Sequence, residues 1–345
     1  MRVELGKNSY DILINVATLD KLGEFVSSSG GKICVVTDDN VAKLYLQTVV
    51  TSLEKSGAQV CNIILPHGEK TKNFSSLLPI YSQLTAFGIT RKDLLVALGG
   101  GVIGDLCGFV AATYLRGIDF VQVPTSLLAQ VDSSVGGKVA VDIAEGKNLV
   151  GAFYQPKLVF VDTNVLTSLP QTFFVDGMAE IIKYACILDK ELFELLESIH
   201  TREQFGERAV EIITRCCDCK RKIVESDERD NAERMKLNYG HTYGHALEKF
   251  YNYEKLTHGQ AVAIGINYIN NIAVKKGLMD KKDCQRIENL LLQFGLDISD
   301  SAQPSEVVKS IVSDKKNLGS NLVVIIVDKI GQSVLYNTNM EFWKI

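Results

Sequence analysis

The sequence contains no long uninterrupted apolar segment. A membrane-spanning helix needs about 18 or more consecutive, mostly apolar residues, but here Gly, Asp or Lys interrupts the longest apolar runs. Residues 1–5 lead directly into mixed polar sequence, without the apolar core of a signal peptide. We therefore expect no membrane association and no targeting segment, and we expect the protein to work in the cytoplasm.

The sequence also has little excess charge of either sign. Its 37 basic and 41 acidic side chains give a formal net charge of −4. A nucleic-acid-binding protein needs a broad cationic surface for the phosphate backbone. This balance predicts no nucleic-acid partner, although it is compatible with a local basic pocket.

The eight cysteines include no C-x-x-C pair. Cys216, Cys217 and Cys219 lie close together, but they fall in a helical pattern over residues 209–224, where such positions do not all share one face. We predict that they are buried structural residues rather than metal ligands, because free cysteine commonly behaves as a small apolar side chain. Such cysteines are typical of a reducing cytosol.

A length of 345 residues with 46% hydrophobic side chains favours two domains over one core. In the first half, short β-branched segments alternate with helical patterns over residues 41–55 and 74–87. This alternation is typical of a parallel sheet covered on both faces. The predicted strands are residues 32–37, 60–65, 94–98, 120–123 and 158–161.

After about residue 166 the apolar periodicity becomes helical, and it stays so to about residue 276. Only residues 322–327 and 333–336 resemble strands, in a predicted terminal hairpin. The predicted fold is α/β, with an N-terminal Rossmann-like parallel-sheet domain (residues 1–166) and a mainly α-helical C-terminal domain (residues 167–345).

A glycine-rich turn follows the predicted strand 94–98. Gly99, Gly101 and Gly104 match G-x-G-x-x-G between a strand and a helix, a pattern typical of dinucleotide binding. A tight structural turn is the alternative. The turn follows a later strand than usual, and no clear acidic residue ends the next strand about 20 positions on. Candidate ribose contacts instead follow earlier strands, at Asp38, Glu69 and Lys72.

Three of the five histidines lie within 18 positions. His241 and His245 are four residues apart, on one face of a predicted helix, and His258 precedes another. Glu180 is a carboxylate in an otherwise apolar segment, and a buried carboxylate needs a partner. Two histidines and one carboxylate are typical of catalytic zinc sites. Structural histidines, or the pair His241–His245 as the ligands, are the alternatives.

Several cations lie in or near glycine-rich segments. Lys138 and Lys147 are flanked by glycines in segments that resemble loops, and Lys183 lies one turn beyond Glu180. Arg234 and Asn238 precede His241. Single lysines are usually solvated surface residues, but this set favours a substrate that carries phosphate and carboxylate groups.

The motifs together resemble the 3-dehydroquinate synthase family, within the sugar-phosphate cyclases. The matching strings occur in family order between residues 99 and 265. They are GGGVIGD, RGIDFVQVPTSLLAQVDSSVGGK, GKNLVGAFYQP, GMAEIIKY, KIVESDERD, LNYGHTYGHALE and HGQAVAIG.

The resemblance implies roles for individual residues. Glu180, His241 and His258 match metal ligands, which moves His245 to the substrate side. The implied substrate contacts are Asp132, Lys138, Asn148, Lys183, Lys220, Arg234, Asn238, His245 and Lys316, with Lys315 as an alternative to Lys316. Arg116 matches an arginine that binds the substrate phosphate of a partner subunit, so a homodimer is implied. The implied NAD contacts are Asp38, Asn40, Glu69, Lys72, Gly101, Val102, Ile103, Gly104, Asp105, Thr125, Ser126, Lys138 and Lys147.

The resemblance also implies an activity and its cofactors, NAD and one divalent metal ion, zinc or cobalt. The reaction would convert 3-deoxy-D-arabino-heptulosonate 7-phosphate to 3-dehydroquinate and phosphate, the second step of the shikimate pathway. It combines transient oxidation, phosphate elimination, reduction, ring opening and an aldol closure, so NAD is regenerated in each turnover.

Three positions depart from the family pattern. Asp230 stands where Glu is expected, Ala232 where Gly is usual, and His67 where Asp is usual. The first departure could shorten a contact to Lys220. None of them removes an implied metal ligand.

Three rival functions remain. A sister cyclase such as 2-deoxy-scyllo-inosose synthase would share the NAD and metal sites, but the intact DSSVGGK segment favours 3-dehydroquinate synthase. A metal-dependent alcohol or glycerol dehydrogenase would share the fold, but it would not need the cation cluster and would produce net NADH. A non-catalytic binding relative would have lost ligand positions, and none is lost here.

Overall fold

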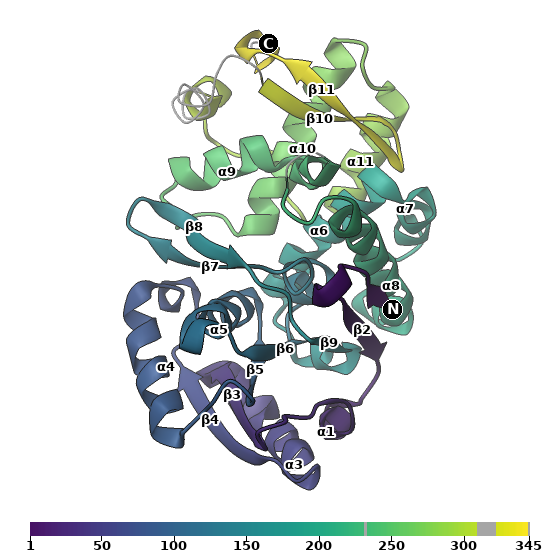
Figure 1. Ribbon diagram of the computed structural model, residues 1–345. Helices are drawn as coiled ribbons and strands as arrows, with labels where there is room; N and C mark the ends of the chain where they lie inside the picture. The colour runs from purple at the N-terminus through teal and green to yellow at the C-terminus, as the bar shows by residue number, and fades with distance from the viewer. Residues whose placement is uncertain (231–232, 309–321, 344–345) are drawn as a thin grey trace. The chain divides into compact units, whose positions relative to one another are not determined.

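The computed structural model describes residues 1–230, 233–308 and 322–343. The chain divides into two compact units, Met1–Leu169 and Pro170–Ile345 (Figure 1). The sequence placed this division at residues 166–167.

The first unit is built on a seven-stranded sheet in the order β1-β2-β9-β6-β5-β3-β4. β1 and β2 pair antiparallel, whereas every other neighbouring pair is parallel. The sheet confirms the predicted fold class of this half. Its strands are β1 (Arg2–Val3), β2 (Tyr10–Asn15), β9 (Leu158–Asp162), β6 (Asp119–Pro124), β5 (Leu94–Gly99), β3 (Lys32–Asp38) and β4 (Gln59–Leu65).

Alternate residues of the central strands enter different apolar cores. In β3, Ile33 and Val35 pack into one core, whereas Cys34 and Val36 pack into the other. Successive side chains of a strand point to opposite faces, so the sheet is buried on both. This explains why the central strands are continuous apolar runs rather than alternating patterns.

Helices cover both faces of this sheet. α4 (Phe74–Phe87) and α5 (Gly101–Thr113) contribute to the core on one face. The short α1 (Leu22–Phe25) and α3 (Gln47–Lys55) contribute to the core on the other, as can be followed in Figure 1. The predicted helix 41–55 is divided, because α2 (Asp39–Val41) and a π-helical turn (Ala42–Leu46) precede α3.

A hairpin outside the main sheet corrects one expectation. Lys138 and Lys147 lie in strands, β7 (Lys138–Ile143) and β8 (Gly146–Phe153), not in loops. The flanking glycines suggested loops, but Gly151 pairs with Ala140 across the hairpin, where an added Cβ would lie 2.9 Å from the Ala140 side chain. Glycine here permits close strand pairing rather than a turn.

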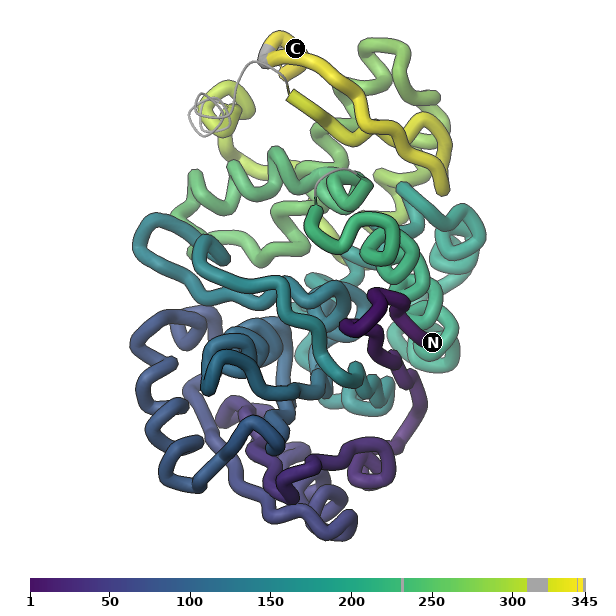
Figure 2. The backbone as a smooth tube through the Cα atoms, in the orientation of Figure 1, coloured from purple at the N-terminus to yellow at the C-terminus, as the bar shows by residue number. Residues whose placement is uncertain are grey.

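The second unit is mainly helical, as predicted, and Figure 2 traces it to a terminal hairpin. β10 (Leu322–Lys329) and β11 (Gln332–Thr338) pair antiparallel at the predicted place. No helix in the described ranges is long and apolar enough to cross a membrane. Its described helices include α6 (Gln171–Leu188), α7 (Lys190–Glu197), α8 (Arg202–Ser226), the 3-10 helix η8 (Glu233–Asn238), α9 (His241–Phe250), α10 (His258–Lys275) and α11 (Lys281–Gln293).

α9 and α10 touch through their backbones. A Cβ added at Gly244 would lie 2.9 Å from the Ala261 carbonyl oxygen, and one added at Gly265 would lie closer still to the carbonyl oxygen of Gly240, the N-cap of α9. Real Cβ atoms do not approach that closely, so these glycines allow a separation that any larger residue would increase.

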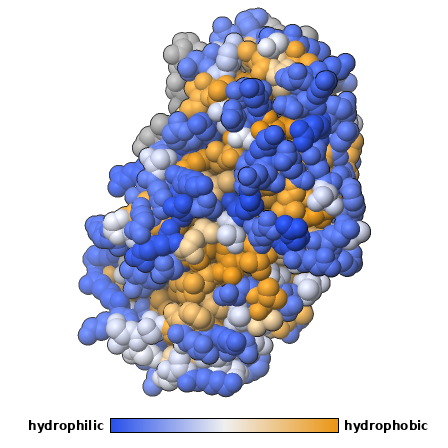
Figure 3. Space-filling view, turned by 90° about the vertical axis from the view of Figure 1, so that its right-hand side faces the viewer, coloured by the Kyte–Doolittle hydropathy of each residue, from blue (hydrophilic) through white to orange (hydrophobic). Residues whose placement is uncertain are grey.

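Some apolar side chains are buried in the cores, whereas others are exposed at the surface. Cys216, Cys217 and Cys219 are free and buried within α8, as predicted. Figure 3 shows apolar residues that reach the surface between hydrophilic ones on the face it presents. The exposed large apolar side chains of the first unit include Val16, Phe25 and Leu44. Individual exposed apolar residues are ordinary in folded proteins.

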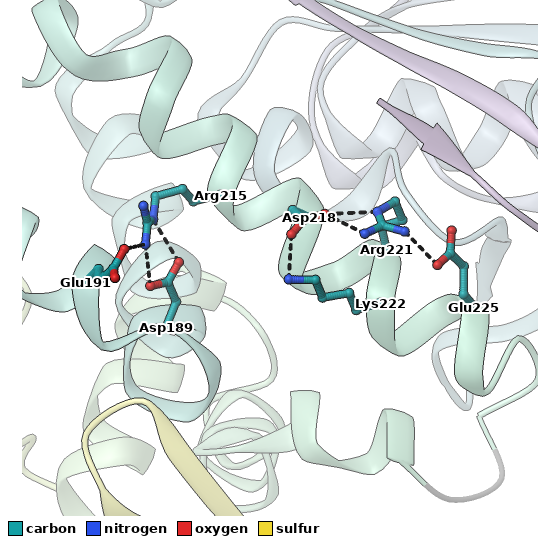
Figure 4. Close-up of polar contacts among 7 residues, drawn as sticks. All are labelled: Asp189, Glu191, Arg215, Asp218, Arg221, Lys222 and Glu225. Atoms are coloured by element: carbon teal, nitrogen blue, oxygen red, sulfur yellow. Dashed lines mark hydrogen bonds and ion pairs between the residues drawn. The ribbon is translucent and has the colours of Figure 1, made fainter.

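An ion-pair network joins the start of α7 to α8 (Figure 4). The Nε and Nη2 atoms of Arg215 donate to the Asp189 carboxylate, at 2.8 and 2.9 Å, and Nη2 also donates to Glu191 at 2.7 Å. Asp189 accepts the backbone N–H of Leu192 as well, which caps α7. Burial alone would raise the pKa of Asp189, but the bonds from Arg215 outweigh it and lower this pKa.

We predict that Asp189→Ala lowers the free energy of unfolding by about 1–2 kcal/mol, because it removes a helix cap and a bidentate ion pair. Glu211→Ala, in an exposed pair with Arg208, is the matched control and should cost less than about 0.5 kcal/mol. Urea unfolding measures both. Because the folded-state pKa of Asp189 is lowered, its contribution is present above its ordinary pKa of 3.8 and is lost as the pH falls below it. Equal losses in the two variants would contradict the prediction.

Candidate functional site

The parallel sheet of the first unit has a point where the strand order reverses. From β3 the chain moves to β4 on one side, and then to β5 on the other. In open α/β sheets, ligands bind at the carboxyl ends of the two strands that flank such a point. Here those ends carry Asp38 on β3 and the turn Gly99–Gly101 after β5. Asp38 and the glycine-rich turn, both predicted to contact a dinucleotide, therefore lie at this edge.

The glycine-rich turn places the start of α5 beside this edge. Gly100 is the N-cap residue and supplies no capping side chain. The first backbone N–H groups of a helix favour an anion such as a pyrophosphate. An added Cβ at Gly101 would lie 3.1 Å from the Ser133 hydroxyl, and one at Gly104 would lie 2.7 Å from the Gln122 amide oxygen. Gly104 therefore packs α5 closely on the sheet.

Lys72 is the buried centre of a polar cluster in the first unit. Its ammonium group donates to Asp105 and to the Asn148 amide oxygen, each at 2.5 Å. Burial would lower the pKa of Lys72, but the carboxylates of Asp105 and Glu69 outweigh it and raise this pKa. The cluster brings Asn148, predicted as a substrate contact, together with three predicted NAD contacts.

The remaining predicted residues of this unit have simpler surroundings. Asp38 caps α2 by accepting the backbone N–H of Asn40. Thr125 and Ser126 follow β6, and Val102 and Ile103 lie in the first turn of α5. Lys138 is exposed on β7, Lys147 is half-buried on β8, and Asp132 lies in the π-helical turn Ala129–Ser133.

The second unit brings the predicted metal ligands together from three helices. Glu180 lies on α6, His241 begins α9 and His258 begins α10. The Nε2 atoms of His241 and His258 lie 3.4 and 3.7 Å from one carboxylate oxygen of Glu180. The nitrogen atoms of His241, His245 and His258 also lie within 4.8 Å of one another.

Glu180 is a buried carboxylate, with 1% of its surface exposed. Burial would raise the pKa of Glu180, but the Lys183 ammonium and the histidines outweigh it and hold this pKa well below its ordinary value. Neither carboxylate oxygen accepts a well-formed hydrogen bond. The carboxylate faces the Lys183 ammonium and two imidazoles without a directed hydrogen bond, which fits the coordination of a metal ion.

The two imidazoles are oriented with Nε2 toward Glu180. The Nδ1 atom of His241 lies 3.0 Å from the Tyr239 carbonyl oxygen, and that of His258 lies 3.5 Å from a Glu248 carboxylate oxygen. Metal-binding histidines usually donate their second ring N–H to such an acceptor. The donor set and its orientation therefore fit one divalent metal ion.

The electrostatics differ between the two rings. Burial lowers the pKa of His241 to about 3, so this ring is neutral at pH 7, which is the form that binds metals. For His258, burial lowers the pKa but the carboxylates of Glu180 and Glu248 outweigh it and raise the pKa to about 10. The surroundings of His258 thus favour positive charge beside Glu180.

His245 occupies a different position in the cluster. It is exposed, whereas His241 and Glu180 are buried. The His245 ring centroid is 5.2 Å from that of His241 and 5.7 Å from that of His258. An exposed imidazole next to the cluster can accept or donate a proton at a bound molecule.

Three predicted substrate contacts are buried cations on mutually contacting elements. Lys183 on α6, Lys220 on α8 and Arg234 on η8 have 2%, 5% and 3% of their surfaces exposed. Asn238 is exposed at the end of η8. Lys183 faces the Glu180 carboxylate, and Arg234 donates to the Glu228 carbonyl oxygen. The positive charge gathered in this part of the unit agrees with the expectation of a negatively charged substrate.

Some predicted positions stand apart from these clusters or outside the description. Arg116 is exposed in the first unit, in a turn where Leu115, Arg116 and Gly117 all have positive φ. Lys315 and Lys316 lie outside the described residues, as does Ala232.

Of the other two departures, His67 makes local contacts, and nothing in the structure explains the replacement at Asp230. His67 binds Asp39 through its ring, at 2.8 Å, and through its backbone N–H, at 3.0 Å, which ties the loop after β4 to the end of β3. Asp230 adopts φ +61°.

Sequence reasoning missed two carboxylates close to the metal cluster. Glu248 faces His258, and Asp176 accepts the backbone N–H of Gly259 at 2.5 Å. The signal for Glu248 was present, because it lies seven residues after His241 and therefore on the same face of α9. Asp176 carried no comparable signal, because its acceptor role depends on the packing of α10 against α6.

Comparison with known families identifies the chain. The family model "3-dehydroquinate synthase N-terminal" matches residues 62–176, and "3-dehydroquinate synthase C-terminal" matches residues 177–317. The chain belongs to the 3-dehydroquinate synthase family. The resemblance inferred from the ordered motifs is thus confirmed.

Curated members of the family match the chain over its full length. It is 51% identical to the 3-dehydroquinate synthase of Clostridium beijerinckii, over 99% of this chain and 98% of that protein. It is 46% identical to the enzyme of Pelobacter propionicus, over 99% of this chain and 96% of that protein.

Solved structures show the same fold. A 2-deoxy-scyllo-inosose synthase complexed with carbaglucose-6-phosphate, NAD⁺ and Co²⁺ matches with a TM-score of 0.89 at 26% identity, covering 99% of this chain and 97% of that one. The NADH-dependent butanol dehydrogenase A of Thermotoga maritima matches with a TM-score of 0.67 at 15% identity, covering 89% of each chain. The latter likeness concerns the fold alone.

We predict that Glu180→Gln weakens Zn²⁺ binding at least about 100-fold, more than the loss of a group outside the coordination sphere. The amide lacks the negative charge that faces His241 and His258. Competition with a chromophoric chelator measures the affinity, and circular dichroism checks folding, because Lys183 loses its buried partner. Glu197→Gln, in the half-exposed pair with Arg286, is the control and should leave Zn²⁺ affinity unchanged. Wild-type affinity in Glu180→Gln would remove Glu180 from the ligand set.

Proposed function

We propose that this protein is a 3-dehydroquinate synthase, which converts 3-deoxy-D-arabino-heptulosonate 7-phosphate to 3-dehydroquinate and phosphate in the shikimate pathway. The observation that carries the proposal is the 51% identity to a curated enzyme of that name across both full chains. The cluster of Glu180, His241 and His258, with its neighbouring buried cations, supports it.

We infer that the enzyme uses NAD and one divalent cation, zinc or cobalt, as the related cyclase complexed with NAD⁺ and Co²⁺ suggests. When bound, the metal supplies Lewis-acid polarisation of a substrate oxygen, and NAD accepts and returns one hydride. Glu180, His241 and His258 would hold the metal. The start of α5, Asp38 and the Lys72 cluster would hold NAD.

The chain's own residues would bind and orient the substrate. Lys183, Lys220 and Arg234 are buried cations suited to its phosphate and carboxylate groups. Burial strengthens such charge pairing, because water screens it less. His245 is the exposed imidazole of the cluster and is suited to move a proton at the substrate. Asp132, Lys138, Asn148, Asn238 and Lys316 complete the proposed substrate contacts.

The test of the proposed function is phosphate release from 3-deoxy-D-arabino-heptulosonate 7-phosphate, with catalytic NAD⁺ and added Zn²⁺. We expect release without net NADH, and its loss in Glu180→Gln. Net NADH without phosphate release would favour a dehydrogenase. Failure to release phosphate, in a protein that binds NAD⁺ and Zn²⁺, would favour a sister cyclase such as 2-deoxy-scyllo-inosose synthase, whose solved structure shares this fold.

We also propose that the enzyme is a homodimer in which Arg116 binds the phosphate at the partner's site. The exposed position of Arg116 and the positive φ of Leu115 and Arg116 support this, because strained turns often position functional side chains.

We propose that the protein works in the cytoplasm. Its eight cysteines are free, which is typical of a reducing compartment.

Subunit complementation tests the role of Arg116. Arg116→Ala and Lys183→Met should each abolish activity, but co-expression of the two variants should restore it at about a quarter of all sites, since half the dimers are mixed and half their sites are intact. Phosphate release by the purified mixed dimer measures this. An inactive mixed dimer would place Arg116 at the site of its own subunit, and a monomeric active enzyme would exclude the dimer.

A further inference from the structure

His258 is fixed at the start of α10 by its neighbours in the chain. Thr257 caps the helix by accepting the backbone N–H of Gln260, and the Gln260 side chain accepts the backbone N–H of Thr257. This reciprocal arrangement holds the first turn of a helix. The backbone of His258 therefore has little freedom, and its ring orientation depends on what the ring touches.

α10 is also bound directly to α6 next to His258. Asp176, one turn before Glu180, accepts the Gly259 backbone N–H at 2.5 Å. A Cβ on Gly259 would lie 2.8 Å from the Asp176 carbonyl carbon. This contact sets the distance between the helix that carries Glu180 and the residue that carries the second imidazole.

The ring of His258 lies between two carboxylates. Its Nε2 faces Glu180 at 3.7 Å, and its Nδ1 faces Glu248 at 3.5 Å. Glu248 comes from α9, the helix that also carries His241, and only 5% of its surface is exposed. A buried carboxylate on the far side of the ring from Glu180 is placed to accept the Nδ1 proton. The Nε2 atom is then available to bind a metal ion.

His241 is supported differently. Its Nδ1 faces the carbonyl oxygen of Tyr239, a backbone group. The two imidazoles of the cluster thus have one neutral backbone acceptor and one charged side-chain acceptor. A carboxylate acceptor makes an imidazole a stronger ligand than a carbonyl does, because it stabilises positive charge on the ring.

We propose that Glu248 is a positioning residue that orients His258 and strengthens it as a metal ligand. The proposal rests on the metal site of the proposed function, and it assigns Glu248 no contact with substrate or metal. Glu248 acts through His258, so its removal should lower metal affinity while the three ligands remain.

The experiment measures Zn²⁺ affinity and the visible absorption of the Co²⁺ protein for wild type, Glu248→Gln and Glu248→Met. In Glu248→Met we expect about 10- to 100-fold weaker Zn²⁺ binding, the range for lost second-sphere acceptors, and an altered Co²⁺ spectrum. Glu248→Gln keeps an acceptor oxygen but loses the charge, so its Zn²⁺ affinity should lie between those of wild type and Glu248→Met. This variant also provides the test if Glu248→Met fails to fold.

Asp300→Asn is the matched control, because Asp300 is another carboxylate of this unit whose side chain is only 8% exposed, and it is bound to the Tyr251 hydroxyl at 2.5 Å. Its Zn²⁺ affinity should equal that of wild type. Wild-type affinity and Co²⁺ spectra in both Glu248 variants, with binding lost in Glu180→Gln, would overturn the role of Glu248 and leave the metal site intact. Equal Zn²⁺ affinity in wild type and Glu180→Gln would instead overturn the metal site itself.

Discussion

The burial of one carboxylate organises the second unit. Glu180 lies within an apolar helix, and its charge is stabilised only because a lysine on the same helix and imidazoles from two other helices face it. Taking such a charge out of water costs several kcal/mol unless it is paired. The helices that supply the partners must therefore approach closely, and the glycines at the contact of α9 and α10 make that approach possible. In this unit, the close packing of the helices and the positions of Glu180, His241 and His258 therefore depend on each other.

The first unit meets a different requirement with a different architecture. Its strands are apolar on both faces, so polar chemistry is excluded from the sheet itself and gathers at the carboxyl ends of the strands. The reversal of strand order between β3 and β5 leaves room there for the start of α5. Lys72 adds a buried positive charge that connects this edge to the β7–β8 hairpin. The combination of sheet edge, helix start and buried cation suits a large anionic cofactor.

Much of this arrangement could be predicted from the sequence, because it rests on local signals. Buried parallel strands, the glycine-rich turn and the histidines four residues apart on one helix each have a distinct pattern, and the family motifs added the pairing of Glu180 with His241 and His258. The β7–β8 hairpin was missed because the glycines around Lys138 and Lys147 resemble loop signals. Gly137 does lie outside the strand, just before β7 and with positive φ, but Gly151 lies within β8 and permits close strand pairing. Glu248 was missed although its spacing from His241 placed it on the same face of α9, because the sequence does not show that this face meets His258 of α10.

The unequal support of the two imidazoles has a consequence for the divergence of such sites. The acceptor of His241 is the backbone carbonyl of residue 239, which stays in place when the side chain of that residue is replaced. Most substitutions at this position should therefore leave the basicity of His241 unchanged. The acceptor of His258 is a side chain and can be exchanged by a single mutation. Relatives that require a different metal, or a different strength of polarisation, could adjust one ligand gradually while the other stays constant. The site thus combines one imidazole whose acceptor is constant, His241, with one whose acceptor can change by mutation, His258.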